Sequence, residues 1–543
     1  MHLSKRQLKF LAALAIATGT TIAGSAVADE ISSAGLEPAV VSVPGRLVSS
    51  NYYYTYDDSA DSEAAAAEPA PAAAEIGETV MADEIVAAPC NCCSTPCCTK
   101  KKSEAATAKM KDAYKGVFYA NDFSYLNDSC YKGPSHLGDS LKGLWGGKLD
   151  IGGESRVRYH NERNSRDFRT GVDDEFVLSR HRLFANLRIN EYFRFYGEAL
   201  YADSTGENFA PRGIEENHGE AQNLFVDVKL TESLTARGGR QEILLGAQRL
   251  VSPLDWANTR RTFDGYRLTY KANDTTIDGF YLNPVNKRLD AWDSTNEGVD
   301  FYGVYASKAG TAVGNLETYY IGLDNQASDF SYHTLGSRVT GATDSGTKYE
   351  FEGGVQFGEN SPGLGHHNAA FMTGGLGQQL DLCLGGSSWK PTVWMWYDWA
   401  SGGDNVPGAR GDDSFDHGFP LAHKYLGFMD LFGRRNINDL NFQFITPIGK
   451  KMKLLVWYHY FFLDQATTPY NVGGAPISTV AAGDKELGSE IDLALSITLD
   501  ARNSALIGYS HFNSGDYYST TVDPGNVSDI DADFFYLQYQ TRF

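Results

Sequence analysis

Residues 533–543 read DFFYLQYQTRF, and this stretch decides the fold. Its side chains alternate in polarity, with Phe535, Leu537, Tyr539 and Phe543 on one face and Gln538, Gln540 and Arg542 on the other. A period of two indicates a β-strand that is apolar on one side and polar on the other. Similar segments recur upstream as far as residue 148. They predict a closed transmembrane barrel with a wet lumen, because a soluble sandwich would have shorter strands.

The composition agrees with an all-β chain. The sequence has 31 Tyr, 29 Phe and 56 Gly but only 7 Met, which is typical of a strand-rich protein with aromatic girdles. The mean hydropathy is -0.34, a value that would ordinarily indicate a soluble protein. Half of every strand in a membrane barrel is polar, so a low mean hydropathy is expected for this class.

The N-terminus has the features of a secretory signal. Lys5, Arg6 and Lys9 precede an apolar run over 10–17, and Ala26-Val27-Ala28 forms a small-x-small cleavage site. We expect residues 1–28 to be removed, leaving Asp29 at the mature N-terminus. An uncleaved anchor is the alternative, but the apolar run is short for a membrane span. The predicted location is the cell outer membrane.

Residues 29–113 form an acidic, Ala- and Pro-rich extension. From 29 to 98 the sequence has 12 acidic residues and one basic residue, Arg46. Low apolar content and charge of one sign oppose collapse into a core, so we expect this extension to be disordered.

The extension also carries a cysteine cluster, with Cys90, Cys92, Cys93, Cys97 and Cys98 close together and Cys130 further on. Disulfides are the default in an exported chain, and we expect these six residues to form them within or between chains. A metal site is the alternative, but no histidine is near and no known zinc spacing fits well.

Residues 114–147 contain several aromatic side chains and form a candidate ordered segment. Two interpretations are open. The segment is either an irregular periplasmic lead-in, which we favour, or a partial plug of the barrel's inner end.

The barrel itself is predicted to span 148–543 with about 18 strands. The expected strands are centred near residues 154, 183, 197, 226, 238, 267, 279, 304, 319, 336, 353, 372, 395, 442, 457, 494, 508 and 538. A tight turn is visible at 189–192 and a long Gly- and Asp-rich loop at 402–434. Such short and long connections are expected at the two ends of a membrane barrel.

Alternation also predicts which charged side chains face the lumen. An Arg or Lys facing the middle of the bilayer costs about 2–4 kcal/mol, so several per strand must face inward. The set from alternation is Glu154, Arg156, Arg158, Arg180, Arg182, Arg188, Arg194, Glu490 and Asp492. These arginines either brace the wall by pairing with acids such as Asp227, or they attract anions along the channel. Arg binds carboxylates through a planar fork and stays charged, which suits the second role.

Several motifs then match a known family. The segments are Gly152-Gly153-Glu154, Gly238–Gly246, Gln248–Val251, Asp255–Asn258, Arg261–Gly265, Ala400–Asp404, Phe415, His423–Gly427, Arg435-Asn436 and Gly488–Leu493. Over about 148–543 the chain resembles the alginate-export family of outer-membrane porins. The resemblance implies an 18-stranded monomer whose Arg-rich pore passes an anionic uronate polymer outward. It also adds Arg240 and Arg267 to the pore-lining set, since the strand phase near 238 is ambiguous.

We therefore expect a channel for anionic polysaccharide or related anions, seated in outer-membrane lipid. The acidic extension and its cysteines depart from the family pattern. They leave one alternative open, a structural outer-membrane anchor that is crosslinked to envelope neighbours through the cysteine-rich segment.

Enzymatic chemistry is not predicted. Ser331, His333 and Asp324 can be combined on paper, but no G-x-S-x-G elbow frames a nucleophile. We expect no cofactor, no metal site and no nucleic-acid partner. Calcium in the long loop through Asp404, Asp412, Asp413 and Asp416 is conceivable, but EF-hand spacing is missing.

Overall fold

A computed structural model describes residues 100–164, 173–289, 291–361, 365–384, 387–403, 413–478, 482–522 and 531–543. The expected signal peptide, most of the acidic extension and the cysteines at 90–98 lie outside these ranges.

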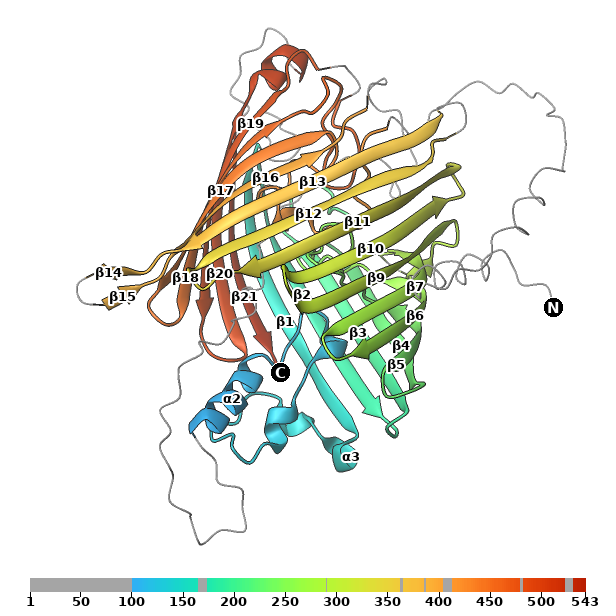
Figure 1. The fold of residues 1–543 in the computed structure, drawn as a ribbon, viewed down its shortest axis with the longest axis vertical. Coiled ribbons are helices and arrows are strands. Elements are labelled where there is room, and N and C mark those ends of the chain that lie inside the picture. Colours follow the sequence, from blue (N-terminus) through green and yellow to red (C-terminus); the bar gives the residue numbers. More distant parts are fainter. Residues whose placement is uncertain are drawn as a thin grey trace, which may run out of the picture.

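The chain forms a closed antiparallel barrel of 18 strands (Figure 1). In order around the barrel the strands are β1 Leu149–Arg163, β2 Asp173–Arg188, β3 Phe193–Thr205, β4 Asn217–Lys229, β5 Leu234–Gln241, β6 Phe263–Ala272, β7 Thr275–Asn286, β9 Val299–Thr311, β10 Gly314–Asn325, β11 Phe330–Ala342, β12 Thr347–Glu359, β13 His366–Gln379, β16 Thr392–Ala400, β17 Ile437–Ile448, β18 Met452–Phe462, β19 Glu486–Thr498, β20 Asn503–Ser514 and β21 Ala532–Arg542. The ring closes between β1 and β21, where Glu154 lies opposite Arg542 and Arg163 opposite Asp533. The predicted fold class is confirmed, and every predicted strand centre falls within one of these strands.

Three short strands lie outside the ring. They are β8 Ser294–Thr295, which pairs with the end of β7, and β14 Leu382–Leu384 with β15 Ser387–Trp389. The last two form a small hairpin that projects from the wall between β13 and β16 (Figure 1).

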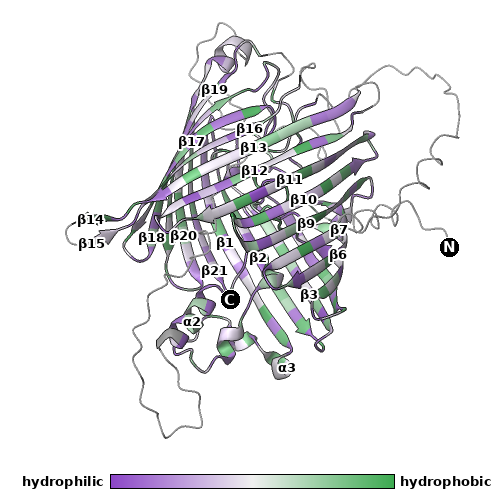
Figure 2. Cartoon of the chain, viewed as in Figure 1, coloured by the Kyte–Doolittle hydropathy of each residue, from purple (hydrophilic) through white to green (hydrophobic). Residues whose placement is uncertain are grey.

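The barrel is apolar outside and polar inside. Leu183, Leu335, Met372 and Leu376 are each more than half exposed, whereas Arg158, Arg180 and Glu490 are buried. Figure 2 shows green and purple residues alternating along the strands. This reverses the arrangement of a soluble protein, and it is the polarity that a barrel in lipid requires.

The two ends of the barrel differ in their connections. One end carries short turns, such as 189–192, 230–233 and 273–274, whereas the other carries the long loops. The start of β1 and the end of β21 lie at the short-turn end. In outer-membrane barrels short turns face the periplasm, so we call this the periplasmic end.

Two of the long loops fold into the barrel. These inner loops comprise residues 242–262, between β5 and β6, and residues 413–436, before β17, and most of their side chains are buried. They meet at a bridge between Val251 and Phe419, where the Ser252 amide donates to the Phe419 carbonyl at 2.8 Å. Their apolar side chains pack with inward aromatic residues of the wall into one core. The barrel interior is therefore partly filled by protein.

The N-terminal part of the described chain lies at the periplasmic end, near the C-terminus (Figure 1). Its elements are α2 Lys100–Lys111, η1 Phe118–Ala120, η2 Ser124–Asn127, η3 Asp139–Leu141 and α3 Leu144–Gly147; η4 Ala422–Lys424 lies in an inner loop and η5 Tyr518–Val522 follows β20. Among the described residues, no helix has the length and apolar character needed to cross a membrane.

Helix α2 differs from the expectation that the extension is disordered up to residue 113. The sequence of α2 is rich in Lys and Ala, which are good helix formers. Ala106 and Met110 are buried, and Met110 packs in a cluster with Tyr125. The tertiary contact thus stabilises a helix that composition alone did not predict.

Candidate channel lining

Four of the predicted arginines form one group on the inner wall, which we call the brace set: Arg156 and Arg158 on β1, and Arg180 and Arg182 on β2. Each is at most 3% exposed. All four face inward as predicted, and alternation in the two strands is the reason.

The brace set holds the first inner loop. Arg156 donates to the carbonyls of Asp255, Trp256 and Ala257 at 2.9–3.0 Å. Arg158 donates to the Trp256 carbonyl at 2.9 Å, and its guanidinium lies over the Trp256 ring. These contacts fix the loop at residues 255–257.

The other two members pair with acids. Arg180 bridges Glu154, at 2.7 Å, and Asp255, at 3.0 Å. Arg182 donates to Glu198 and lies 3.7 Å from Glu242 of the inner loop. Glu154 also accepts hydrogen bonds from Gln540 and Arg542, so it links β1, β2 and the closing strand.

A second group lies nearer the periplasmic end and forms the lower row: Arg188, Arg194, Arg237 and Arg267. These residues stand on β2, β3, β5 and β6 at nearly one level, since Arg188 pairs in register with Arg194, and Arg237 with Arg267. Their side chains are 42%, 24%, 11% and 13% exposed, in that order. The lower row is thus more accessible than the brace set.

Acidic side chains pair with the lower row without covering it. Asp227 on β4 accepts from Arg194 at 3.2 Å and from Arg237 at 2.7 Å. Arg267 pairs with Asp278 at 2.8 Å, and Arg188 with Asp150 at 2.8 Å. Each arginine is held in a defined orientation by these bonds.

The backbone of β5 explains why the sequence did not show which of its side chains face the lumen. Arg240 pairs with Asp264 at 2.9 Å and also with Glu220, so it faces inward like Arg237, although three positions separate the two. Gly239 lies between them with φ of 128°, and a Cβ there would stand 2.3 Å from the Leu224 carbonyl oxygen. The glycine pair lets the strand bring both arginines inward. Sequence reasoning missed Arg237, which alternation from Thr235 could have found.

A further patch of the inner wall, three strands around the ring from β1, is acidic. Glu490 and Asp492 on β19 face inward as predicted and are fully buried. Glu490 accepts from the Met429 amide of the second inner loop at 2.8 Å. His459 on β18 lies 2.8 Å from Asp439 and 3.7 Å from Asp492. The two acids therefore contact the second inner loop, much as the brace set contacts the first.

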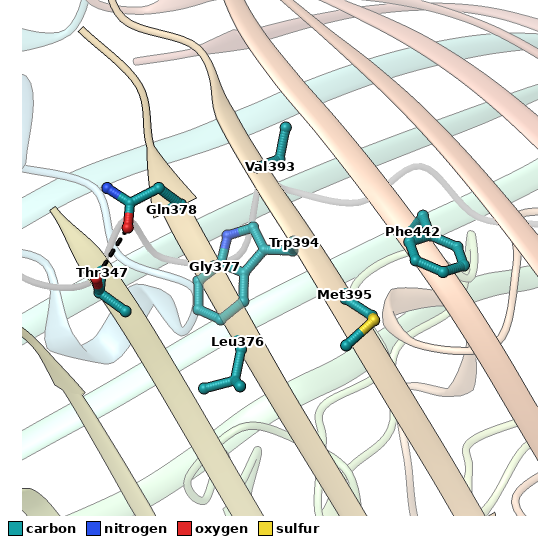
Figure 3. Close-up of a pocket in the computed structure, with 8 residues that line it drawn as sticks. All are labelled: Thr347, Leu376, Gly377, Gln378, Val393, Trp394, Met395 and Phe442. Atoms are coloured by element: carbon teal, nitrogen blue, oxygen red, sulfur yellow. Dashed lines mark hydrogen bonds between the residues drawn. The ribbon is translucent and has the colours of Figure 1, made fainter.

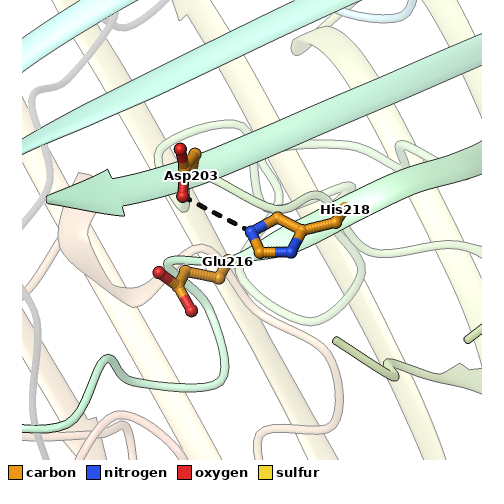
Figure 4. A group of neighbouring side chains, drawn as sticks. All are labelled: Asp203, Glu216 and His218. Carbon is orange, nitrogen blue, oxygen red and sulfur yellow. Dashed lines mark hydrogen bonds and ion pairs between the residues drawn. The ribbon is translucent and has the colours of Figure 1, made fainter. Parts of the chain in front are cut away.

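The described residues include one group with the chemistry of a metal site. Asp203, Glu216 and His218 offer ligand atoms that all lie within 4.8 Å of one another at the long-loop end of β3 and β4 (Figure 4). Two of the loop acids conceivable as calcium ligands have hydrogen-bond partners. Asp413 accepts a hydrogen bond from the Asn368 amide, and Asp416 accepts one from the Tyr332 hydroxyl. Asp404 and Asp412 lie outside the described ranges.

The outer face carries a shallow apolar groove over β12, β13, β16 and β17 (Figure 3). Leu376, Met395 and Phe442 are about half exposed beside it. Trp394 lies against Gly377, where a Cβ would stand 2.4 Å from the indole ring. Aromatic side chains over glycine are a known way to cover exposed backbone in a sheet.

Two cysteines lie within the described residues. Cys130 is disulfide-bonded. Cys383, on the β14–β15 hairpin, is free and exposed. The predicted pairing of the cysteines at 90–98 stays a prediction.

Inward charges, an apolar outer face and a closed antiparallel ring define an outer-membrane β-barrel of the channel type. The family model described as alginate export matches residues 148–526. The chain belongs to the alginate export family. No curated protein matches the sequence.

Solved structures of other proteins are similar at low identity. OccK8 (OprE) of Pseudomonas aeruginosa is 14% identical with a TM-score of 0.48, covering 73% of this chain and 98% of its own. OccK3 (OpdO) of the same organism is 13% identical with a TM-score of 0.49, covering 74% and 96%. OccAB1 of Acinetobacter baumannii is 12% identical with a TM-score of 0.48, covering 73% and 96%. The family match, and not these likenesses, supports the assignment.

Proposed function

We propose that this protein passes anionic polysaccharide, or smaller anions of the same chemistry, along the arginine-rich wall formed by β1 to β6. The observation that carries the proposal is the direct opposition of arginines across neighbouring strands. In the lower row the pairs are Arg188 with Arg194 and Arg237 with Arg267. Like charges directly opposite each other destabilise a sheet. Two such pairs at one level of the inner wall favour a role in binding anions over a role in stability alone.

The lower row is the part of this wall that suits contact with a solute. Its arginines are partly exposed, and their planar guanidinium groups match carboxylates. The acids beside them, Asp227 and Asp278, reduce the net charge of the row. Conduction requires binding weak enough for release, and partial neutralisation supplies this.

The brace set has a structural role in the proposed channel. It holds the first inner loop across the lumen and so narrows the passage beside the lower row. The solute would then pass between the inner loops and the lower row.

Single-channel recording tests the proposal. In planar bilayers with a KCl gradient, the reversal potential during openings of the full-length protein should show a preference for chloride. Polymannuronate should block the current. Arg188→Glu should reduce both effects about twofold or more, because the side chain is exposed and its charge is reversed.

Lys308→Glu is the matched control. Lys308 is exposed on the outer face of β9, so the same change in charge there should leave selectivity unaltered. A wild-type channel that prefers potassium, or equal selectivity in the two variants, would overturn the proposal.

A further inference from the structure

Residues 113–125, which we call the mouth segment, enter the barrel at its periplasmic end. Phe118 is 2% exposed and packs with Phe184, Tyr196 and Phe225, three aromatic residues of the inner wall. Its ring centroid lies 5.8 Å from that of Phe184. A segment that served only as a connection to β1 would not need to bury an aromatic side chain in the lumen.

Tyr119 lies on the lower row. Arg194 donates to the Tyr119 carbonyl at 2.6 Å, and the Arg237 guanidinium lies 4.1 Å from the Tyr119 ring centroid. Arg267 reaches the Tyr119 hydroxyl at 3.4 Å. Three of the four arginines in the row therefore contact one residue of the mouth segment.

Further contacts hold the rest of the segment. The Tyr119 hydroxyl donates to the Glu242 carbonyl of the first inner loop at 2.9 Å. Arg260 of the same loop donates to the Gly116 carbonyl at 2.8 Å. The mouth segment thus joins the wall to the first inner loop.

Both ends of the segment are fixed outside the membrane span. The Tyr114 hydroxyl donates to a backbone oxygen of Phe543, and burial raises the pKa of Tyr114. Arg502, in the turn before β20, donates to the Tyr125 hydroxyl at 2.6 Å. These bonds place the aromatic centre of the segment over the channel mouth.

We propose that the mouth segment is a plug that occupies the anion site formed by Arg194, Arg237 and Arg267. It competes with the anionic solute for these arginines and leaves the site when the solute passes. Cation–π contact and a carbonyl acceptor satisfy the guanidinium groups while the solute is absent. This inference rests on the proposed channel function.

The first experiment compares full-length proteins in planar bilayers. Phe118→Ala with Tyr119→Ala should raise the open probability about tenfold or more, because a buried and a partly buried aromatic anchor are lost. Trp145→Ala is the control, since Trp145 lies outside the mouth segment and is 72% exposed. Equal open probability in the wild type and the double variant would overturn the plug.

The selectivity of the same variant separates the two proposals. A double variant that opens more and prefers chloride supports both. One that opens more without anion preference supports the plug and overturns the proposed function. One that opens like the wild type and prefers chloride overturns the plug alone.

A second measurement needs no variant. Hydrogen exchange at the amides of 113–125 should become at least about threefold faster when polymannuronate is added, because the polymer displaces the segment from the arginines. Exchange at the barrel strands should stay constant. Unchanged exchange in the segment, under conditions where the polymer blocks the channel, would overturn the competition.

Discussion

The brace set and the lower row are made of the same residue on the same wall, yet they differ in what they touch. The brace set is buried and donates to fixed carbonyls of an inner loop. The lower row is partly exposed and pairs with acids on neighbouring strands. Strand alternation decides which way an arginine faces. What it faces decides whether the arginine is structural or available to a solute.

The largest expected effect is on the brace set. Arg180→Met should destabilise the barrel by about 3–5 kcal/mol, because it leaves buried Glu154 without its main partner. Denaturant unfolding in detergent, followed by circular dichroism, measures this. The control Arg188→Met removes a partly exposed arginine and should cost about 1 kcal/mol or less. Equal losses of unfolding free energy in the two variants would show that the brace set and the lower row contribute equally to stability.

A second prediction concerns the geometry that brings Arg237 and Arg240 to the same side. Gly239→Ala should cost about 1–3 kcal/mol, since φ is positive and the new Cβ meets a backbone oxygen. Gly238→Ala is the matched control, because its Cβ would lie at an ordinary 3.4 Å from the Tyr266 ring. The same unfolding assay compares them. If Gly238→Ala were the more harmful change, our account of β5 would be wrong.

The smallest effect on stability is expected in the lower row. Arg194→Gln should change the free energy of unfolding by about 1 kcal/mol or less, because Asp227 keeps its two bonds to Arg237. The chloride preference should nevertheless fall, as a shift of the reversal potential towards zero. A large loss of stability with constant selectivity would place Arg194 with the brace set.

Much of the wall could be predicted from the sequence because the energetic rule is simple. A charge facing lipid is costly, so the inward position of Arg156, Arg180 and Glu490 follows from alternation alone. The rule fails where the backbone departs from a regular strand. Gly239, with its positive φ, is such a place, and it is the reason that the inward direction of Arg240 could not be read from alternation.

The inner loops could not be predicted. Trp256, Phe415 and Phe428 are buried in the barrel core, but an aromatic residue in a loop has the same local sequence whether it packs inside or reaches into solvent. Whether such a residue packs inside the barrel depends on the width of the lumen and on the shape of both loops. The mouth segment posed the same problem. From the sequence, its aromatic residues favoured a lead-in over a plug, because local sequence does not reveal that Phe118 packs against Phe184 and Phe225.

The core formed by the inner loops also has a consequence for how the protein is assembled. The seam joins Glu154 to Arg542, residues that are 388 positions apart, so the ring cannot close until the last strand is present. Contacts between such distant residues form slowly. Until then the sheet is open along its seam, and the inner loops can reach its inner face from the side as well as from the long-loop end. The last strand therefore sets the moment at which the side entrance to the interior is lost.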